Sequence, residues 1–212
     1  MDFRQEAFTK AVPALLKNLE KRGMEGYYFE NCTSMVQAIV EMIPAGSVVS
    51  WGGSESLTQS GMMKALQQND SFTLIDRMAA KTEQERREIY ARTVMSNYYF
   101  CSTNAITYEG ELVNIDGNGN RVACIMQGPE HVMLIVGMNK LVADLECAVK
   151  RIRTNACPPN AIRLHMHTPC ALTGKCADCQ SPECFCSQIV VTRRSRHAGR
   201  IKVFLVAEEL GF

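Results

Sequence analysis

The alternation of strand-length apolar runs with amphipathic helical segments constrains the fold of this 212-residue chain more than any other feature. Apolar runs of strand length lie at 25–29, 47–51, 72–75, 98–101 and 131–136. Segments with apolar residues at helical spacing are interleaved with them, at 3–22, 31–43, 55–68, 82–96 and 141–155. Further strands are predicted at 106–115, 121–127, 187–192 and 200–206. This order predicts an α/β fold, an open, doubly wound, mostly parallel sheet with helices on both faces.

Composition and charge narrow the class of protein. Hydrophobic residues make up 46% and charged residues 21%, which is typical of a globular chain, and 1–212 is predicted as a single domain. The net charge of +1 offers no basic stripe for nucleic acid. The start of the chain has no apolar signal region, and the apolar runs are far shorter than the roughly 20 residues of a membrane helix. We therefore expect a cytoplasmic protein with no membrane span and no nucleic-acid partner.

The turn after the strand 47–51 is the first candidate site, and it reads Gly52-Gly53-Ser54-Glu55. A glycine pair allows a sharp turn, and the helix that follows offers free N–H groups to a phosphate or carboxylate. An ordinary strand-to-helix turn with Ser54 as N-cap explains the same residues. Neither GxGxxG nor a Walker loop is present, so the chain has no nucleotide-binding fingerprint.

The second candidate site is the polar segment 114–121, which contains Asn118, Asn120 and Arg121. Asp-Gly and Asn-Gly pairs are typical of hairpin turns, and two in succession predict a longer polar loop that closes over an anion, with a simple flexible hairpin loop as the alternative. Together with the first turn and Asn104, this loop is predicted to form one anion pocket at the carboxyl edge of the sheet. Arg121 would grip two anion oxygens with its planar guanidinium, and Lys140 would add a second charge unless it is merely solvated.

Half of the ten cysteines are concentrated in 17 residues near the C-terminus: Cys170, Cys176, Cys179, Cys184 and Cys186. One CxxC step with single cysteines on either side favours a cubane iron–sulfur cluster (4Fe-4S) over zinc, and the metal-binding segment is predicted to span 157–187. Disulfides are the alternative, but five thiols leave one unpaired. The nearby histidines, His165 and His167, are interpreted as structural.

Two other groups of residues are predicted to have no special chemistry. The scattered cysteines 32, 101, 124 and 147 sit in apolar stretches and are typical of small buried hydrophobes. The basic run 193–200 is interpreted as a solvated hairpin tip between the last two strands.

The chain resembles the lactate-utilisation (LUD) domain family across nearly its whole length. The resemblance rests on paired blocks: 51–57 (WGGSESL), 103–107 (TNAIT), 112–122, Gly128-Pro129, 137–140 (GMNK), the TPC-x5-CxxC segment from Thr168, and the ending 199–212. It implies a fold like that of the ribose-phosphate isomerase and CoA-transferase group. It also implies Cys170, Cys176, Cys179 and Cys186 as metal ligands. Cys184 stands where a basic residue is expected, so it can substitute for Cys186.

The resemblance implies oxidation of L-lactate to pyruvate, in which this chain would be an iron–sulfur or accessory subunit beside iron–sulfur partner subunits. A second hypothesis is a regulatory domain that binds a small carboxylate or phosphate, with a structural metal site and no redox activity. The sequence leaves open which metal is bound, whether the protein is catalytic, and whether it forms a homo-oligomer. Coloured protein that bleaches with dithionite would favour the first hypothesis, and colourless, zinc-containing protein the second.

Overall fold

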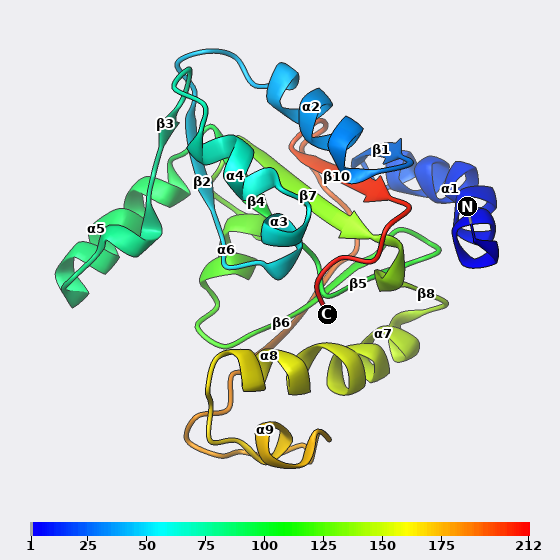
Figure 1. Cartoon of the computed structure of the whole chain (residues 1–212), viewed down its shortest axis with the longest axis vertical. Coiled ribbons are helices and arrows are strands. Elements are labelled where there is room, and N and C mark those ends of the chain that lie inside the picture. Colours follow the sequence, from blue (N-terminus) through cyan, green and yellow to red (C-terminus); the bar gives the residue numbers. More distant parts are fainter. Residues whose placement is uncertain (1) are drawn as a thin grey trace.

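The computed structural model describes residues 2–212, and at its centre is a six-stranded sheet in which every neighbouring pair is parallel. The strand order is β1-β10-β7-β4-β2-β3 (Figure 1). These strands are β1 (Glu25–Phe29), β2 (Val48–Trp51), β3 (Thr73–Leu74), β4 (Tyr98–Cys101), β7 (His131–Gly137) and β10 (Ile201–Val206).

Helices cover both faces of this sheet, which confirms the predicted doubly wound α/β fold. One face packs against α1 (Phe3–Lys21), α5 (Glu83–Val94) and α6 (Asn120–Met126), and the other against α2 (Cys32–Met42), α3 (Glu55–Gln59) and α4 (Met62–Gln67). Side chains of β7 alternate between the two cores: Leu134 and Val136 belong to the first, Met133 and Ile135 to the second. Because successive side chains of a strand point to opposite faces, a strand covered on both sides is apolar throughout.

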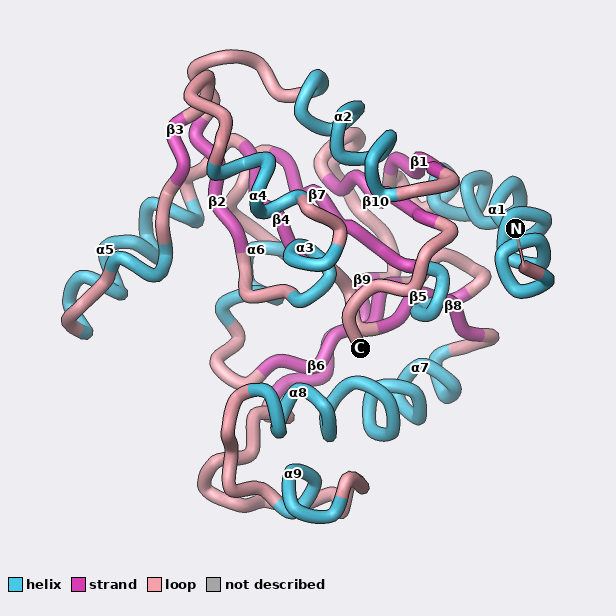
Figure 2. Tube along the Cα trace, viewed as in Figure 1, coloured by secondary structure: helices cyan, strands magenta, loops and turns pink. Residues whose placement is uncertain are grey.

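A second, smaller sheet lies beyond the carboxyl ends of the main strands, with the order β8-β5-β6-β9. Its strands are β5 (Ala105–Thr107), β6 (Leu112–Asp116), β8 (Leu141–Val142) and β9 (Gln188–Thr192). It packs against a nearly continuous helical stretch, α7 (Leu145–Arg151), the π-helical turn η3 (Ile152–Ala156) and α8 (Cys157–Arg163). The remaining elements are two 3-10 turns, η1 (Arg77–Ala79) and η2 (Met138–Lys140), and the short helix α9 (Pro169–Thr173). Figures 1 and 2 show α9 and the irregular chain around it at one end of the molecule, beyond α8.

The hairpin predicted around the segment 114–121 is wrong, because residues 121–127 form most of helix α6 rather than a strand. Asp116 accepts a hydrogen bond from the backbone N–H of Gly119 at 3.0 Å, and Gly119 starts the helix with φ +76°. The segment is therefore a strand-to-helix turn. A short apolar run such as 122–126 fits a helix as well as a strand, and periodicity alone does not separate them.

The predicted pairing of the last two strands is also wrong: β9 belongs to the small sheet and β10 to the main one. The basic run between them is therefore not a hairpin tip, although Arg193, Arg194, Arg196 and His197 are exposed to solvent as predicted. Ser195 is buried, and the guanidinium of Arg200 donates to the carbonyl oxygens of Cys124 and Ile125 at the end of α6. Arg200 therefore caps a helix, a role that charge pattern alone does not reveal.

Two predicted boundaries shift, and Pro13 lies inside α1 without breaking it. Pro13 is on the exposed side of the helix, where water can satisfy the carbonyl that loses its donor. The segment 106–115 is two strands, β5 and β6. The helix predicted at 141–155 begins at Leu145 after an Asp144 cap and continues through η3 into α8.

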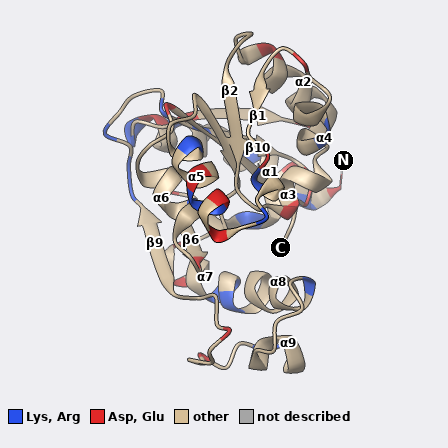
Figure 3. Cartoon of the chain, turned by 90° about the vertical axis from the view of Figure 1, so that its left-hand side faces the viewer, with Lys and Arg blue, Asp and Glu red and all other residues tan. Residues whose placement is uncertain are grey.

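No helix in residues 2–212 combines the length and the apolar character that crossing a membrane requires. Basic and acidic residues are mixed along α5, as Figure 3 shows, instead of forming one continuous basic stripe there.

Candidate functional site

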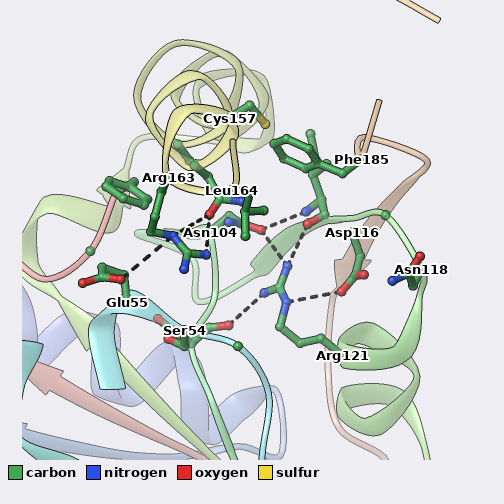
Figure 4. Close-up of a pocket in the computed structure, with 18 of the residues that line it drawn as sticks. Ser54, Glu55, Asn104, Asp116, Asn118, Arg121, Cys157, Arg163, Leu164 and Phe185 are labelled. Carbon is green, nitrogen blue, oxygen red and sulfur yellow. Dashed lines mark hydrogen bonds and ion pairs between the residues drawn. The ribbon is translucent and has the colours of Figure 1, made fainter. Parts of the chain in front are cut away.

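A cavity of about 570 Å³ opens where β2, β4 and β6 end and α3, α6 and α8 approach one another. Eight of the nine residues predicted from sequence to bind an anion line it: Gly53, Ser54, Glu55, Asn104, Asn118, Asn120, Arg121 and Lys140. Figure 4 shows how several of them face the cavity. The structure thus brings the two predicted sites together in one pocket, and binding of an anion there stays a prediction.

Gly52, the ninth residue, supports the pocket from behind. A Cβ at this position would collide with the hydroxyl of Tyr99 and would lie 3.5 Å from Cγ of Arg121. Only glycine lets the backbone after β2 approach these side chains so closely. Ser54 is the N-cap of α3, but its side chain makes no capping hydrogen bond. The ordinary N-cap interaction weighed from the sequence is therefore absent at Ser54.

Arg121 is a structural part of the pocket wall. Its guanidinium donates to the backbone carbonyl oxygens of Ser102 and Ile115, at 3.0 and 2.7 Å. It also donates to the side-chain oxygens of Asn114 and Asn104, at 2.6 and 2.9 Å. Its Nε lies 3.3 Å from the carboxylate of Asp116. An arginine has five N–H donors, so none is left for the predicted two-pronged grip on a ligand.

Lys140 is the most deeply buried charged side chain of the pocket, with 4% of its surface exposed, so the solvated-lysine interpretation is wrong. Its Nζ donates to the hydroxyl oxygens of Ser56 and Ser102 at 2.7 and 2.9 Å. Burial, reinforced by the guanidinium groups of Arg151 and Arg121, lowers the pKa of Lys140 to about 7. Among residues 2–212 no carboxylate lies within ion-pair distance of this nitrogen.

Sequence reasoning missed two cationic residues of the pocket, Arg77 and Arg163. Arg163 lies 3.9 Å from Glu55, whereas Arg77 has neither an ion pair nor a side-chain hydrogen bond within the described part of the chain. Arg77 belongs to the short turn η1, and nothing in its neighbourhood in the sequence distinguishes it. Within residues 2–212, Arg77 therefore gives the pocket a positive charge that no carboxylate balances, and the protonated fraction of Lys140 adds to it.

The acidic residues of the pocket wall are already engaged. Asp116 pairs with Arg121, and Glu55 faces Arg163. Glu183 accepts a hydrogen bond from the backbone N–H of His167 at 2.6 Å, and this contact lowers the pKa of the Glu183 carboxyl. The same hydrogen bond joins the two ends of the cysteine-bearing loop, residues 167 and 183.

A second cavity, of about 60 Å³, is lined by six cysteines: Cys157, Cys170, Cys176, Cys179, Cys184 and Cys186. All five cysteines of the predicted cluster are present, and Cys157 from the start of α8 joins them. All ten cysteines of the chain are free thiols. Within residues 2–212, no three Cys, His, Asp or Glu side chains stand close enough together to hold a metal ion. The thiols therefore surround one space without converging on a point.

The thiols of this second cavity influence one another. The Sγ atoms of Cys186 and Cys157 lie 3.5 Å apart, and this contact together with burial raises the pKa of Cys186. The backbone N–H of Ser181 lowers the pKa of the Cys179 thiol. Both Cys184 and Cys186 line the cavity, so the choice between them stays open.

The two cavities share a wall. Cys157, Cys184 and Phe185 line both of them. Gly117 packs directly against Phe185, because a Cβ on Gly117 would lie 2.9 Å from the Phe185 Cβ. A ligand in the larger cavity would be separated from a group held by the thiols by a single layer of side chains.

One solved structure agrees with this fold over nearly the whole chain. A structure described as a DUF162 family protein from Deinococcus radiodurans aligns with a TM-score of 0.54, covering 94% of this chain and 98% of that one at 9% identity. The structure of eIF2B delta from Chaetomium thermophilum aligns at a TM-score of 0.37 and 12% identity, over 56% of this chain and 50% of that one. A search of curated proteins found no match. The family model of the LUD domain matches residues 12–206, and the chain therefore belongs to the LUD domain family.

Proposed function

We propose that this LUD-domain protein binds a small 2-hydroxy or 2-oxo carboxylate in the larger cavity, as part of a system that oxidises L-lactate to pyruvate. Family membership supports a role related to lactate utilisation. The observation that carries the proposal is the guanidinium of Arg77, which lines the cavity without an ion pair in the described part of the chain, beside the Lys140 amine, which has no carboxylate partner there either. An anionic ligand would supply the missing charge, because a buried cation is costly unless it is paired.

We propose further that the cysteine segment holds an iron–sulfur cluster. Six thiols around one small cavity are the donor set that such clusters and zinc prefer, and the pair Cys157–Cys186 is already in contact. Cys170, Cys176, Cys179 and Cys186 would be the ligands, with Cys184 as the substitute. When bound, such a cluster supplies one-electron relay to iron–sulfur partner subunits.

The chain's own residues would bind and orient the acid. The guanidinium of Arg77 would attract the carboxylate, and the Lys140 amine and the backbone N–H groups at the start of α3 would add hydrogen-bond donors. Arg121 would contribute indirectly, by holding Asn104 and Asp116 in the wall. Phe185, on the shared wall, would limit the access of water to the thiols.

Ligand binding is tested by calorimetric titration of L-lactate, pyruvate and inorganic phosphate into wild type and Arg77→Gln. A charge-assisted hydrogen bond contributes about 1.5–3 kcal/mol, so we expect the affinity for the carboxylates to fall at least about tenfold in Arg77→Gln. Arg87→Gln, on the exposed surface of α5, is the matched control and should bind like wild type. Absence of carboxylate binding by wild type would refute the proposed ligand, and phosphate binding alone would favour the regulatory alternative.

The cluster is tested by anaerobic reconstitution with iron and sulfide. We expect visible absorbance that bleaches with dithionite, and less bound iron in Cys176→Ser. Cys147→Ser is the control, because Cys147 lines neither cavity. Full iron content in Cys176→Ser would remove Cys176 from the ligands. A colourless protein that retains zinc would replace the redox role with a structural one.

A further inference from the structure

The position of Lys140 suits a chemical role beyond attraction of an anion. It ends the turn η2, which follows the carboxyl end of β7, and its side chain reaches the cavity between the start of α3 and the end of β4. A lysine that only stabilises a buried structure usually pairs with a carboxylate or with carbonyl oxygens. The partners of Nζ are the hydroxyl groups of Ser56 and Ser102, which accept from Nζ and donate to the backbone carbonyls of Leu210 and Ile135, so each can pass a proton on.

The surroundings of Nζ favour the neutral amine. Burial removes water from Nζ, and the guanidinium groups of Arg151 and Arg121 lie near it, so that the pKa of Lys140 falls to about 7, while Cys101 on β4 acts in the opposite direction. A desolvated lysine beside other cations is the arrangement that activates an amine as a nucleophile towards carbonyl compounds. At pH 7 about half of such amines are neutral, against roughly one in two thousand for a lysine of ordinary pKa.

We propose that Lys140 forms a covalent imine with the carbonyl carbon of a small 2-oxo acid bound in this cavity. The inference rests on the proposed function, because it needs the carboxylate of the acid to be held there. It adds an activity, covalent capture of the 2-oxo acid, and it identifies the reacting atom as Nζ. Pyruvate, the product of lactate oxidation, is the simplest acid of this class.

The step balances without any further reactant. The neutral amine attacks the carbonyl carbon, a C–N bond forms, and the C=O π pair moves to the oxygen. A proton passes from the nitrogen to that oxygen, by way of the Ser56 or Ser102 hydroxyl, to give a carbinolamine. The remaining proton of the nitrogen then passes to the same oxygen, the C–O bond breaks and the oxygen leaves as water, so that an imine remains on Lys140, and its nitrogen takes up a proton from solvent. The reverse sequence, in which water adds, releases the 2-oxo acid.

The imine is trapped by treating the protein with pyruvate and cyanoborohydride at pH 7, which reduces it to a stable secondary amine, followed by peptide mapping by mass spectrometry. We expect the adduct on Lys140 at a yield at least about tenfold above that on Lys64, an exposed lysine of α4. An excess of L-lactate, which has the carboxylate but no carbonyl, should suppress it. An adduct spread evenly over the exposed lysines, or no adduct, would overturn the inference.

Two controls separate this inference from the proposed function. Calorimetry on the same preparation reports whether carboxylates bind. Binding without an adduct overturns the imine and leaves the proposed function intact, whereas failure of both removes the site. Lys140→Arg keeps the charge but cannot form an imine, and it should bind L-lactate without being trapped. If Lys140→Arg folds poorly, peptide mapping of the wild-type protein still shows whether the adduct forms on Lys140.

Discussion

The two neighbouring cavities differ in what holds their walls. The walls of the larger cavity are fixed by Arg121, which bonds to two backbone carbonyls, two asparagines and one carboxylate. Most of the wall of the smaller one comes from α9 and the irregular chain that follows it up to β9, with Ile115, Arg153 and Cys157 completing it. A few exposed side-chain contacts hold that segment in place, such as the ion pair of Arg153 with Asp178 and the contact of His167 with Glu183. The difference indicates a binding pocket that is formed in advance, beside a thiol site that a metal would complete.

Arg121→Ala is expected to give the largest loss of stability. The guanidinium and the Asp116 carboxylate are 14% and 9% exposed, so the substitution leaves a buried carboxylate and two asparagines without their partner. Removing one partner of a buried pair costs about 3–5 kcal/mol of unfolding free energy. Urea unfolding followed by circular dichroism measures this loss. Arg121→Lys should recover little of it, because an ammonium cannot reach five acceptors.

The control for Arg121→Ala is Arg86→Ala on α5. Arg86 forms an ion pair with Glu83 at 3.0 Å, but the two side chains are 64% and 76% exposed. Exposed pairs contribute about 0–1 kcal/mol, so this variant should unfold almost like wild type. Equal losses in the two variants would contradict the view that Arg121 builds the wall of the larger cavity.

The sequence was sufficient for the parts of the fold that depend on local pattern. Strands buried on both faces are continuous apolar runs, and the Asn31 and Thr82 caps define the starts of α2 and α5. It was insufficient where tertiary pairing decides. The run 122–126 became a helix because Gly119 and Asp116 form a turn before it, and β9 joined β6 rather than β10.

In the candidate site, too, the sequence predicts what depends on local pattern and misses what depends on tertiary contacts. The turns at 52–55 and 117–121 were predicted to meet because both adjoin strand ends, and they do line one cavity. The burial of Lys140 and the full occupation of Arg121 depend on side chains distant in sequence, such as Ser56 and Asn104. Arg77 has no sequence signal at all. Cys157 lies too far from the CxxC step for its spacing to have suggested the contact with Cys186.

Lys140→Met measures how much unfolding free energy the protein loses by burying a lysine in the wall of the larger cavity. The folded pKa of Lys140 is about 7, against about 10.4 in an unfolded chain, so the unfolded state binds more protons between these values. The unfolding free energy of wild type relative to Lys140→Met should therefore rise with pH in this window, by up to about 1.4 kcal/mol per pH unit. Below pH 7 the variant should be the more stable protein, because it avoids burying an ammonium.

This pH dependence is measured by urea unfolding of both proteins between pH 6 and 9. The difference between the two unfolding free energies cancels the contribution of the cysteines, which titrate in both proteins. Cys101, Arg121 and Arg151, which act on the pKa of Lys140, are present in both proteins next to residue 140. Lys64→Met, which removes an exposed lysine from α4, is the matched control. A difference between wild type and Lys140→Met that stays constant across the range would mean that Lys140 keeps its charge in the folded protein.

A matched pair of glycines gives the smallest effect and the most direct test of the difference between the two regions. Gly119, beside the larger cavity, and Gly174, at the end of α9, have φ angles of +76° and +71°. A Cβ would meet nothing closer than 3.6 Å at Gly119 and nothing within 4 Å at Gly174. Substitution by alanine therefore imposes the same backbone penalty at both, about 1–2 kcal/mol, without a steric clash.

We expect Gly119→Ala to lower the global unfolding free energy by about that amount, because α6 carries Arg121 and packs in the main core. Gly174→Ala should leave global unfolding unchanged and instead raise the rate of proteolysis within 168–187 at least about fivefold, since it favours a local opening. Loading iron should abolish that increase if the thiols hold a cluster. Equal losses of global stability would show that the cysteine segment unfolds together with the pocket, and the two regions would then be one cooperative unit.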